Sequence, residues 1–284
     1  MMMVSRLLSI RSRAPELWGF ISSKSVRQLC TSTPNGYKEP PKVEEAETVY
    51  ESPSHQDKLL VLGGNGFVGT HVCKEGIQRG IIVSSLSRSG RPSIQEPWTN
   101  DVIWHKGNLL DPQSLRNALD GVSAVISCVG GFGSNAAMFK INGSANIKAI
   151  QEAFESGVKR FVYISAADFG FANFLLRGYY EGKRAAEKAL LDRFPYGGVI
   201  LRPGFIYGTR YVGSFKIPLG IVGAPLETVL RNVKSAAQIP VIGPLFVPPV
   251  SASSVAKVAV RGATDVAFPP GIIDVWGISR LADH

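Results

Sequence analysis

Short apolar runs alternate with amphipathic segments through residues 58–202. Apolar runs bounded by turns predict parallel strands that are buried on both faces, and apolar stripes at helical spacing predict the crossover helices between them. We expect strands at Leu59–Leu62, Ile81–Ser87, Val102–His105, Ala124–Cys128, Phe161–Ser165 and Val199–Leu201. We expect helices at about Phe67–Gln78, Pro112–Leu119, Asn142–Ser156 and Tyr179–Arg193. The alternation predicts an α/β fold with a doubly wound parallel sheet and a small C-terminal substrate or partner region at about residues 203–284.

A glycine-rich turn joins the first predicted strand to the first predicted helix. It consists of Gly63, Gly64, Asn65, Gly66, Phe67, Val68 and Gly69. Glycines let the backbone turn tightly and approach a pyrophosphate without a Cβ in the way, and the helix N-terminus then faces the negative charge. The turn fits both GxGxxG from Gly64 and GxxGxxG from Gly63. Its place between a strand and a helix predicts a Rossmann-like NAD(P)-binding domain over residues 58–284, and a turn without a ligand is the weaker alternative.

The residues after the second predicted strand indicate which dinucleotide is bound. A site for NAD(H) usually carries Asp or Glu there to bind the ribose hydroxyls, but no acid occurs between Ile81 and Gln95. Ser87 and Arg88 stand there instead, and a guanidinium suits a 2′-phosphate. The sequence therefore predicts NADP(H) in preference to NAD(H), with a merely solvated Arg88 as the alternative.

Residues that follow the other strands are further candidates for the cofactor site, because ligands of such sheets lie beyond the carboxyl ends of the strands. We expect contacts from Asn108 and Leu109 after the third strand and from Cys128 and Gly130 after the fourth. For the Cys128 thiol, a small buried apolar group is the preferred interpretation.

The first 30 residues differ in composition from the rest of the chain. They contain five basic residues, the single acid Glu16, several serines and scattered apolar residues, which is typical of an organelle transit peptide. The order Arg27-Gln28-Leu29 resembles a mitochondrial processing site and predicts removal near Leu29 or Cys30. We expect a mitochondrial location on the matrix side, peripheral to the inner membrane; a plastid and an uncleaved basic tail are the alternatives. Residues 31–57 are rich in Pro, Ser and Glu and predict a disordered linker.

The positive charge belongs to the predicted folded part. The formal net charge is +9, and residues 1–57 hold seven basic and seven acidic side chains, so the surplus lies in residues 58–284. A basic surface favours a phosphorylated cofactor, an anionic membrane surface or an acidic protein partner. The Lys and Arg residues are dispersed and form no nucleic-acid module, so we expect no nucleic-acid partner.

Cysteines and histidines show no spacing that suits a metal ion. The three Cys and four His residues are far apart, so we expect neither a metal site nor a disulfide framework. No run of about 18 uninterrupted apolar residues occurs, so we expect no transmembrane helix.

Six segments together resemble the extended and atypical short-chain dehydrogenase/reductases over about Lys58 to Thr264. They are Gly63–Gly69, Gly107–Asp111, Asn142–Asn146, Phe161–Ala167, Tyr179–Lys183 and Leu201–Gly208. The resemblance implies that Tyr179 is the general acid/base and that Lys183 lowers the pKa of its phenol and binds the nicotinamide ribose. It also implies cofactor contacts from Pro203 and Gly204. Tyr179 and Lys183 are four residues apart, so a helix presents both on one face.

One catalytic group of the family is displaced in this chain. The family carries Ser or Thr shortly after the fifth strand, where Ala166 stands here with Ser165 one residue earlier. Ser165 is the candidate for this role, and without it the site lacks the hydroxyl that orients a substrate carbonyl. The sequence therefore leaves turnover open, whereas cofactor binding does not depend on this hydroxyl.

Within the family, the chain is most similar to the mitochondrial branch that contains the NADPH-binding accessory subunit of respiratory complex I and the reductase-like protein of coenzyme Q biosynthesis. This similarity implies a role in coenzyme Q (ubiquinone) biosynthesis, with redox chemistry on a quinone-type precursor and an inner-membrane-associated complex as partner. A non-catalytic structural or assembly subunit is the alternative, and an epimerase or reductase of a soluble metabolite is a third. We expect the apolar side chains before Tyr179 to line a quinone or lipid cleft or to rest on a membrane or a partner subunit, with core packing as the alternative; they are Phe169, Phe171, Phe174, Leu175 and Leu176.

Overall fold

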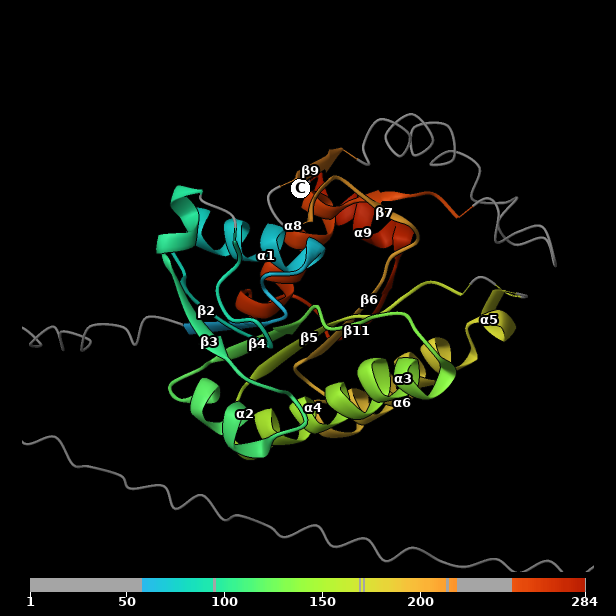
Figure 1. Cartoon of the computed structure of the whole chain (residues 1–284), viewed down its shortest axis with the longest axis horizontal. Coiled ribbons are helices and arrows are strands. Elements are labelled where there is room, and N and C mark those ends of the chain that lie inside the picture. The colour runs from blue at the N-terminus through green and yellow to red at the C-terminus, as the bar shows by residue number, and fades with distance from the viewer. Residues whose placement is uncertain are drawn as a thin grey trace, which may run out of the picture. The chain divides into compact units, whose positions relative to one another are not determined.

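A seven-stranded parallel sheet forms the centre of the computed structural model, which describes residues 58–93, 96–168, 170, 172–212, 215–218 and 247–283 (Figure 1). Its order is β11-β6-β5-β4-β1-β2-β3, and every neighbouring pair is parallel. The strands are β1 (Lys58–Leu62), β2 (Ile82–Ser87), β3 (Val102–Lys106), β4 (Ala124–Ser127), β5 (Arg160–Ile164), β6 (Gly198–Arg202) and β11 (Gly271–Asp274). The predicted α/β fold is confirmed. The predicted transit peptide and linker lie outside the described residues.

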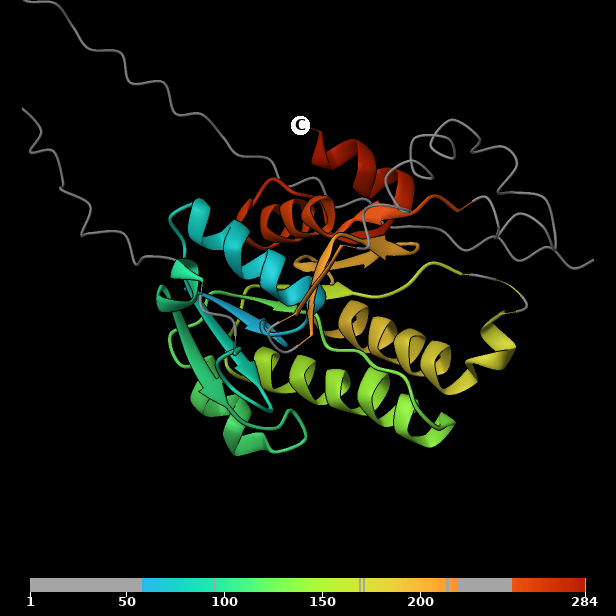
Figure 2. The ribbon, with the colours of Figure 1, turned by 45° about the horizontal axis from the view of Figure 1, so that its top comes forward.

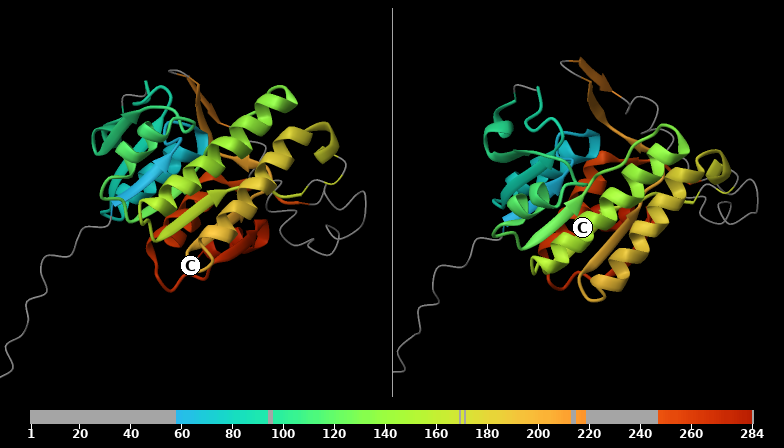
Figure 3. Two further views of the ribbon diagram at one scale, coloured as in Figure 1. Left: turned by 90° about the horizontal axis from the view of Figure 1, so that it is seen from below. Right: turned by 60° about the horizontal axis from the view of Figure 1, so that its bottom comes forward.

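Helices cover both faces of the sheet. One layer contains α1 (Phe67–Gln78), α8 (Ala252–Thr264) and α9 (Val275–Ala282), and Figure 2 shows α1 and α8 side by side. The other contains α2 (Pro112–Leu119), α4 (Ala145–Glu155) and α6 (Arg177–Arg193), and Figure 3 shows α4 and α6 side by side. The chain is therefore wound on both faces of the sheet.

A hydrophobic cluster fills the space between the sheet and each helical layer. Leu59 and Val61 of β1 belong to the cluster with α8, and Leu60 and Leu62 belong to the cluster with α2 and α6. Successive side chains of a strand point to opposite faces, so an uninterrupted apolar run serves both clusters. Burial on both faces is the reason why the central strands could be recognised from apolar runs.

The edge strand β11 escaped the sequence pattern. It pairs with β6 from Gly271↔Val199 to Asp274↔Arg202. Exposed and half-buried residues alternate along it, and Gly271 has a φ of +123°, a conformation that favours glycine. Its only apolar residues are Ile272 and Ile273, between Gly271 and Asp274, so the strand is too short to stand out as a buried apolar run.

The third predicted helix begins earlier than the pattern indicated. α3 (Asn135–Phe139), a π-turn labelled η2 (Lys140–Ser144) and α4 follow one another without a break. The Ser134 hydroxyl caps α3 by accepting a hydrogen bond from the Ala137 N–H at 3.3 Å. A π-turn holds more residues than an α-turn, so the apolar stripe changes phase inside it. The bounds predicted for α1 and α2 are confirmed, and α6 begins two residues before Tyr179.

Short elements complete the described part of the chain. β7 (Ile206–Tyr207) pairs in parallel with β10 (Val250–Ser251), and β8 (Thr209–Val212) pairs antiparallel with β9 (Phe215–Pro218). The 3₁₀ turn η1 (Pro97–Asn100) precedes β3, and α5 (Ala172–Leu175) precedes α6. Among the helices of the described residues, none has the length and apolar character needed to cross a membrane.

Candidate functional site

The glycine turn between β1 and α1 has a conformation that requires its glycines. Gly63 has a φ of +79°, and its carbonyl accepts a hydrogen bond from the Gly66 N–H at 2.9 Å. A Cβ on Gly69 would lie 2.1 Å from the Gly63 oxygen, and a Cβ on Gly64 would lie 2.3 Å from Ser85 Oγ. Contacts this short cannot exist, so both overlapping glycine patterns describe real constraints.

The start of α1 lies directly behind this turn. Gly66 is the N-cap residue and supplies no side-chain oxygen to the first N–H groups of the helix. Those N–H groups and the helix dipole attract an anion. The close backbone cradle and the uncapped helix start fit the pyrophosphate of a dinucleotide. Phe67 packs edge-on against His71 with ring centroids 5.9 Å apart, and Val68 contacts the core.

The end of β2 is tied to the glycine turn. Asn65 Nδ2 donates a hydrogen bond to Ser89 Oγ at 2.6 Å and a second to the Gly90 carbonyl at 3.2 Å. The buried Ser87 hydroxyl donates to the same carbonyl at 2.9 Å, so it is engaged within this turn. Arg88 is exposed and has no hydrogen bond or ion pair with any residue that the structure describes.

The residues after β3 and β4 that were predicted to contact the cofactor lie in different environments. Asn108 is exposed and accepts a hydrogen bond from the Leu110 N–H at 3.1 Å, whereas Leu109 is buried. Burial raises the pKa of the Cys128 thiol to about 12, so this thiol stays protonated, in keeping with the unreactive interpretation. A Cβ on Gly130 would lie 3.2 Å from Lys183 Nζ, so the loop passes directly beside that ammonium.

Tyr179 and Lys183 lie on one face near the start of α6, as predicted. Lys183 is buried, and its Nζ donates to the Ile164 carbonyl at 2.7 Å and to the Val129 carbonyl at 3.5 Å. The same nitrogen lies 5.7 Å from the Tyr179 ring centre and 4.7 Å from that of Tyr163. Burial lowers the pKa of Lys183 to about 7.

The Tyr179 phenol differs from the expectation drawn from the family. Burial is the main cause that raises its pKa to about 12, and Tyr180 adds to the rise while Arg184 opposes it. Phe132, from the loop after β4, stacks on the Tyr179 ring with centroids 5.0 Å apart and an angle of 11° between the planes. The phenol therefore holds its proton at neutral pH.

The Ser165 hydroxyl belongs to a buried ionic network. It donates to Glu187 Oε1 at 2.5 Å, and Glu187 also pairs with Arg184 and with Arg202. Burial by itself would raise the pKa of Glu187, but hydrogen bonds from Arg202 and Ser165 and the nearby positive charges bring it below its usual value. Ala166 is buried and its carbonyl accepts a hydrogen bond from Arg184 at 2.9 Å. In this arrangement no hydroxyl from this segment stands ready for a substrate carbonyl.

Asn142 is a site residue that the sequence reasoning did not single out. It lies in the π-turn, donates to the Gly131 carbonyl at 2.8 Å and accepts from the Gly131 N–H at 3.2 Å. Its own carbonyl accepts a hydrogen bond from Tyr163 Oη at 3.0 Å. π-turns often occur at functional sites. The available signal was the segment Asn142–Asn146, which was recognised as a motif without a role for its side chains.

Pro203 and Gly204 lie beyond the end of β6. The carbonyl of the buried Pro203 accepts a hydrogen bond from the Ala167 N–H at 2.8 Å, which links the segments after β5 and β6. A Cβ on Gly204 would lie 2.7 Å from the Pro248 carbonyl oxygen. This close approach joins the segment after β6 to the C-terminal region.

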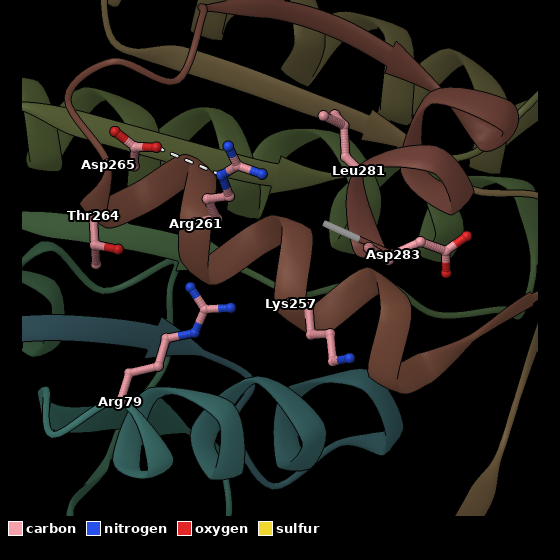
Figure 4. Close-up of a pocket in the computed structure, with 8 residues that line it drawn as sticks. Arg79, Lys257, Arg261, Thr264, Asp265, Leu281 and Asp283 are labelled. Atoms are coloured by element: carbon pink, nitrogen blue, oxygen red, sulfur yellow. Dashed lines mark ion pairs between the residues drawn. The ribbon is translucent and has the colours of Figure 1, made fainter.

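A pocket of about 580 Å³ lies away from these residues, between the C-terminal ends of α1, α8 and α9 (Figure 4). Its lining residues are Arg79, Lys257, Arg261, Thr264, Asp265, Leu281, Ala282 and Asp283. Arg79 pairs with Glu75 at 2.7 Å and Arg261 with Asp265 at 3.5 Å, so two of its three cations are already neutralised. Helix C-termini carry negative partial charge, and this pocket therefore suits a dinucleotide less well than the glycine turn does.

The fold and the glycine turn define a dinucleotide-binding protein of the Rossmann class. Residues 63–214 match the family model described as NAD(P)H-binding, which is more than half of the chain. The chain therefore belongs to this NAD(P)H-binding family, whose architecture is that of the short-chain dehydrogenase/reductases.

Three relatives and one solved structure are similar to this chain. An uncharacterized chloroplastic protein of Arabidopsis thaliana is 40% identical over 80% of this chain and 77% of its own length. MIOREX complex component 2 of Saccharomyces cerevisiae is 28% identical over 53% of this chain and 73% of its own. The mitochondrial protein fmp-52 of Neurospora crassa is 27% identical over 56% and 69%. The NAD complex of WbmG from Bordetella bronchiseptica has the same fold, with a TM-score of 0.56, 18% identity and coverage of 80% and 76%.

Proposed function

We propose that the chain binds NADP(H) in the glycine turn and that Arg88 holds the 2′-phosphate. The observation that supports this proposal is the state of Arg88 at the end of β2. Arg88 follows the last strand residue, is exposed and has no partner among the described residues. The next acid along the chain, Glu96, is paired with Lys74 at 2.5 Å. The hydrogen bond from Asn65 to Ser89 holds the pyrophosphate cradle and the predicted phosphate site in one unit.

Substitution of Arg88 tests the choice of cofactor. Arg88→Ala should weaken NADPH binding about 10- to 100-fold, because hydrogen bonds to charged groups contribute about 1.5–3 kcal/mol, and should leave NADH binding unchanged. Calorimetry on the full-length chain measures both affinities. Arg91→Ala is the matched control, because the Arg91 guanidinium is held by Thr99 and Asn100. An equal loss for both dinucleotides would refute the role of Arg88.

We infer an oxidoreductase that reduces a carbonyl group. NADPH supplies a hydride when it is bound. Tyr179 donates the proton to the substrate oxygen, and its raised pKa suits an acid that must hold a proton until that moment. Lys183 lies against the Tyr179 ring and, as the resemblance implies, binds the nicotinamide ribose.

The conservative variant Tyr179→Phe separates chemistry from binding. It should reduce NADPH oxidation with a quinone substrate at least 100-fold, because general acid catalysis contributes about 10²–10⁴-fold, while NADPH affinity stays the same. Full turnover in this variant would exclude the proposed mechanism.

A cofactor-binding subunit without turnover is the second candidate. The bond from the Ser165 hydroxyl to Glu187 and the apolar Ala166 favour it, because both leave the substrate carbonyl without the usual hydroxyl. The name of the yeast relative, a complex component, is consistent with it. Comigration of the native protein with a large organellar complex, together with unchanged function of Tyr179→Phe in cells, would favour this candidate over the enzyme.

We propose an organellar location, with the mitochondrial matrix side of the inner membrane and coenzyme Q biosynthesis as the first choice. The basic, serine-rich first 30 residues and the mitochondrial fungal relative support it. The chloroplastic Arabidopsis relative supports a plastid instead. Import of the full-length chain into isolated mitochondria and chloroplasts decides between them, because a transit peptide is cleaved in the organelle that it addresses.

A further inference from the structure

The residues Ser87, Arg88, Ser89 and Gly90 form a tight turn that follows β2. The Gly90 N–H donates a hydrogen bond to the Ser87 carbonyl at 3.2 Å, and the Ser87 hydroxyl donates to the Gly90 carbonyl at 2.9 Å. Gly90 has a φ of +71°, a conformation that favours glycine. The two ends of the turn are therefore joined, and its two central residues, Arg88 and Ser89, are exposed.

Asn65 of the glycine turn reaches this second turn with its side-chain amide. Its Nδ2 donates one hydrogen bond to Ser89 Oγ at 2.6 Å and another to the Gly90 carbonyl at 3.2 Å. A carbonyl oxygen can only accept, so the contact with Gly90 requires the amide nitrogen, and not the amide oxygen, to face the turn. Ser89 Oγ consequently accepts the hydrogen bond that it shares with Asn65.

The Ser89 hydroxyl therefore keeps its own proton available for a ligand. A hydroxyl donates one hydrogen bond and can accept two, and Asn65 uses only the accepting side of Ser89. Within the described part of the chain, nothing accepts the Ser89 proton, whereas the Ser87 proton is given to Gly90. An exposed hydroxyl donor thus follows the Arg88 guanidinium directly in the chain.

We propose that Asn65 is a positioning residue for the choice of cofactor: it holds the Ser89 hydroxyl so that its proton, together with the Arg88 guanidinium, meets the 2′-phosphate of NADP(H). The proposal deepens the proposed function and rests on it. A hydrogen bond to an ionised phosphate is about twice as strong as one to a neutral ribose hydroxyl. Ser89 therefore contributes more to the binding of NADPH than to that of NADH, and Asn65 acts through Ser89.

The glycine turn keeps its place on β2 without the Asn65 side chain. The Gly63 N–H donates to the Leu86 carbonyl at 2.9 Å, and the Gly64 N–H donates to Ser85 Oγ at 3.1 Å. Both donors are main-chain groups that Asn65→Ala leaves in place. We therefore expect this substitution to spare the pyrophosphate cradle, so that the affinity for NADH reports whether the turn is intact.

A double-mutant cycle on the full-length chain tests the proposal, with the affinities for NADPH and NADH measured by calorimetry. Ser89→Ala should weaken NADPH binding about 10-fold, as for the loss of one hydrogen bond to a charged group. Asn65→Ala should weaken it about 3- to 5-fold, because the hydroxyl remains but must be ordered when the ligand binds. Both variants should leave NADH affinity unchanged. Added to Ser89→Ala, Asn65→Ala should have no further effect on NADPH, because the two residues act as one unit.

Asn117→Ala is the matched control for Asn65→Ala. Asn117 is exposed on α2, and its side chain accepts a hydrogen bond from Gln113 at 2.6 Å. This variant should bind both dinucleotides as the wild type does.

The outcomes separate this role from the proposed function. If the wild type binds neither dinucleotide or prefers NADH, the proposed function itself fails. The role of Asn65 alone is overturned if the wild type prefers NADPH and Asn65→Ala leaves that affinity unchanged or lowers both affinities equally. It is also overturned if the effects of Asn65→Ala and Ser89→Ala on NADPH add up in full.

Discussion

Lys183 is buried with backbone carbonyls as its hydrogen-bond partners, and this placement determines how it titrates. Its nearest partner is the Ile164 carbonyl at 2.7 Å, and burial lowers its pKa to about 7. Removing an ammonium from water disfavours its charged form, and neutral carbonyls compensate only in part. The ligand-free protein therefore contains both charged and neutral Lys183 at neutral pH.

Binding of a dinucleotide should take up protons. Negative phosphates and ribose hydroxyls stabilise the ammonium and raise the pKa of Lys183 above about 7, so the complex holds more protons than the free protein at pH 7–8. Affinity should accordingly fall as the pH rises above 7. Calorimetry in buffers of different ionisation enthalpy measures the uptake, with NADH as the ligand because it lacks a titrating 2′-phosphate. Lys183→Met should abolish the uptake, and no uptake in the wild type would contradict the role of this lysine.

The buried carboxylate of Glu187 should matter for stability, because two arginines depend on it for their counter-charge. Glu187→Gln leaves Arg184 and Arg202 without their counter-charge, and both are only about 30% exposed. Breaking a buried pair costs about 3–5 kcal/mol, and partial exposure of the arginines reduces our expectation to about 2–3 kcal/mol. Urea unfolding measures the loss. Glu181→Gln on the same helix is the control, since its pair with Arg177 is exposed and should cost less than about 0.5 kcal/mol.

The sequence reveals some of these site residues better than others. The glycine turn was predictable because its pattern, glycines at fixed spacing between an apolar run and a helix, lies within a few consecutive residues. The direction of the Ser165 hydroxyl was not, because it depends on Glu187, which comes from a different element. Phe132 was missed for the same reason: only the fold brings it onto Tyr179.

At the scale of elements, the β1–α1 unit depends on one close approach. A Cβ on Gly69 would lie 2.1 Å from the Gly63 oxygen, so Gly69→Ala must push the helix away from the turn. We expect loss of dinucleotide binding and a destabilisation of about 1–3 kcal/mol, as for overpacking. Thermal unfolding and calorimetry measure both effects.

Gly262→Ala is the control for this prediction. Gly262 lies in α8, and its added Cβ would meet its nearest neighbours at 3.5 Å, an ordinary contact. Alanine has the higher helix propensity, so this variant should be neutral or more stable and should bind normally. If the two substitutions had the same effect, the close approach in the turn would not be the cause.

Element boundaries were predictable where local chemistry sets them. α2 begins at Pro112 because the Asp111 carboxylate caps the N–H groups of Gln113 and Ser114 and proline fits the first helical position. The start of α3 lies beyond a π-turn that shifts the apolar stripe, and β11 is recognised only through its pairing with β6. The signal for the start of α2 lies in neighbouring residues. The start of α3 and the strand β11 depend on the tertiary structure.

On the scale of the whole molecule, the strand order determines where the candidate site lies. β2 and β3 lie on one side of β1, and β4, β5, β6 and β11 lie on the other, so the winding reverses at β1 and β4. Ligands of doubly wound sheets bind beyond the carboxyl ends of the strands at this reversal. A Cβ on Gly63 would lie 3.2 Å from Val129, which shows that the turn after β1 and the loop after β4 meet there. The two parts of the candidate site, the glycine turn and the loop after β4 that reaches Tyr179, therefore meet at the carboxyl ends of the strands.

Titration of NADPH into the full-length chain by calorimetry tests the central claim, a phosphorylated dinucleotide in the glycine turn, most directly. The account predicts one site per chain and an affinity for NADPH at least about tenfold above that for NADH, the difference that one guanidinium–phosphate contact supplies. Absence of binding for both dinucleotides, or a preference for NADH, would contradict it.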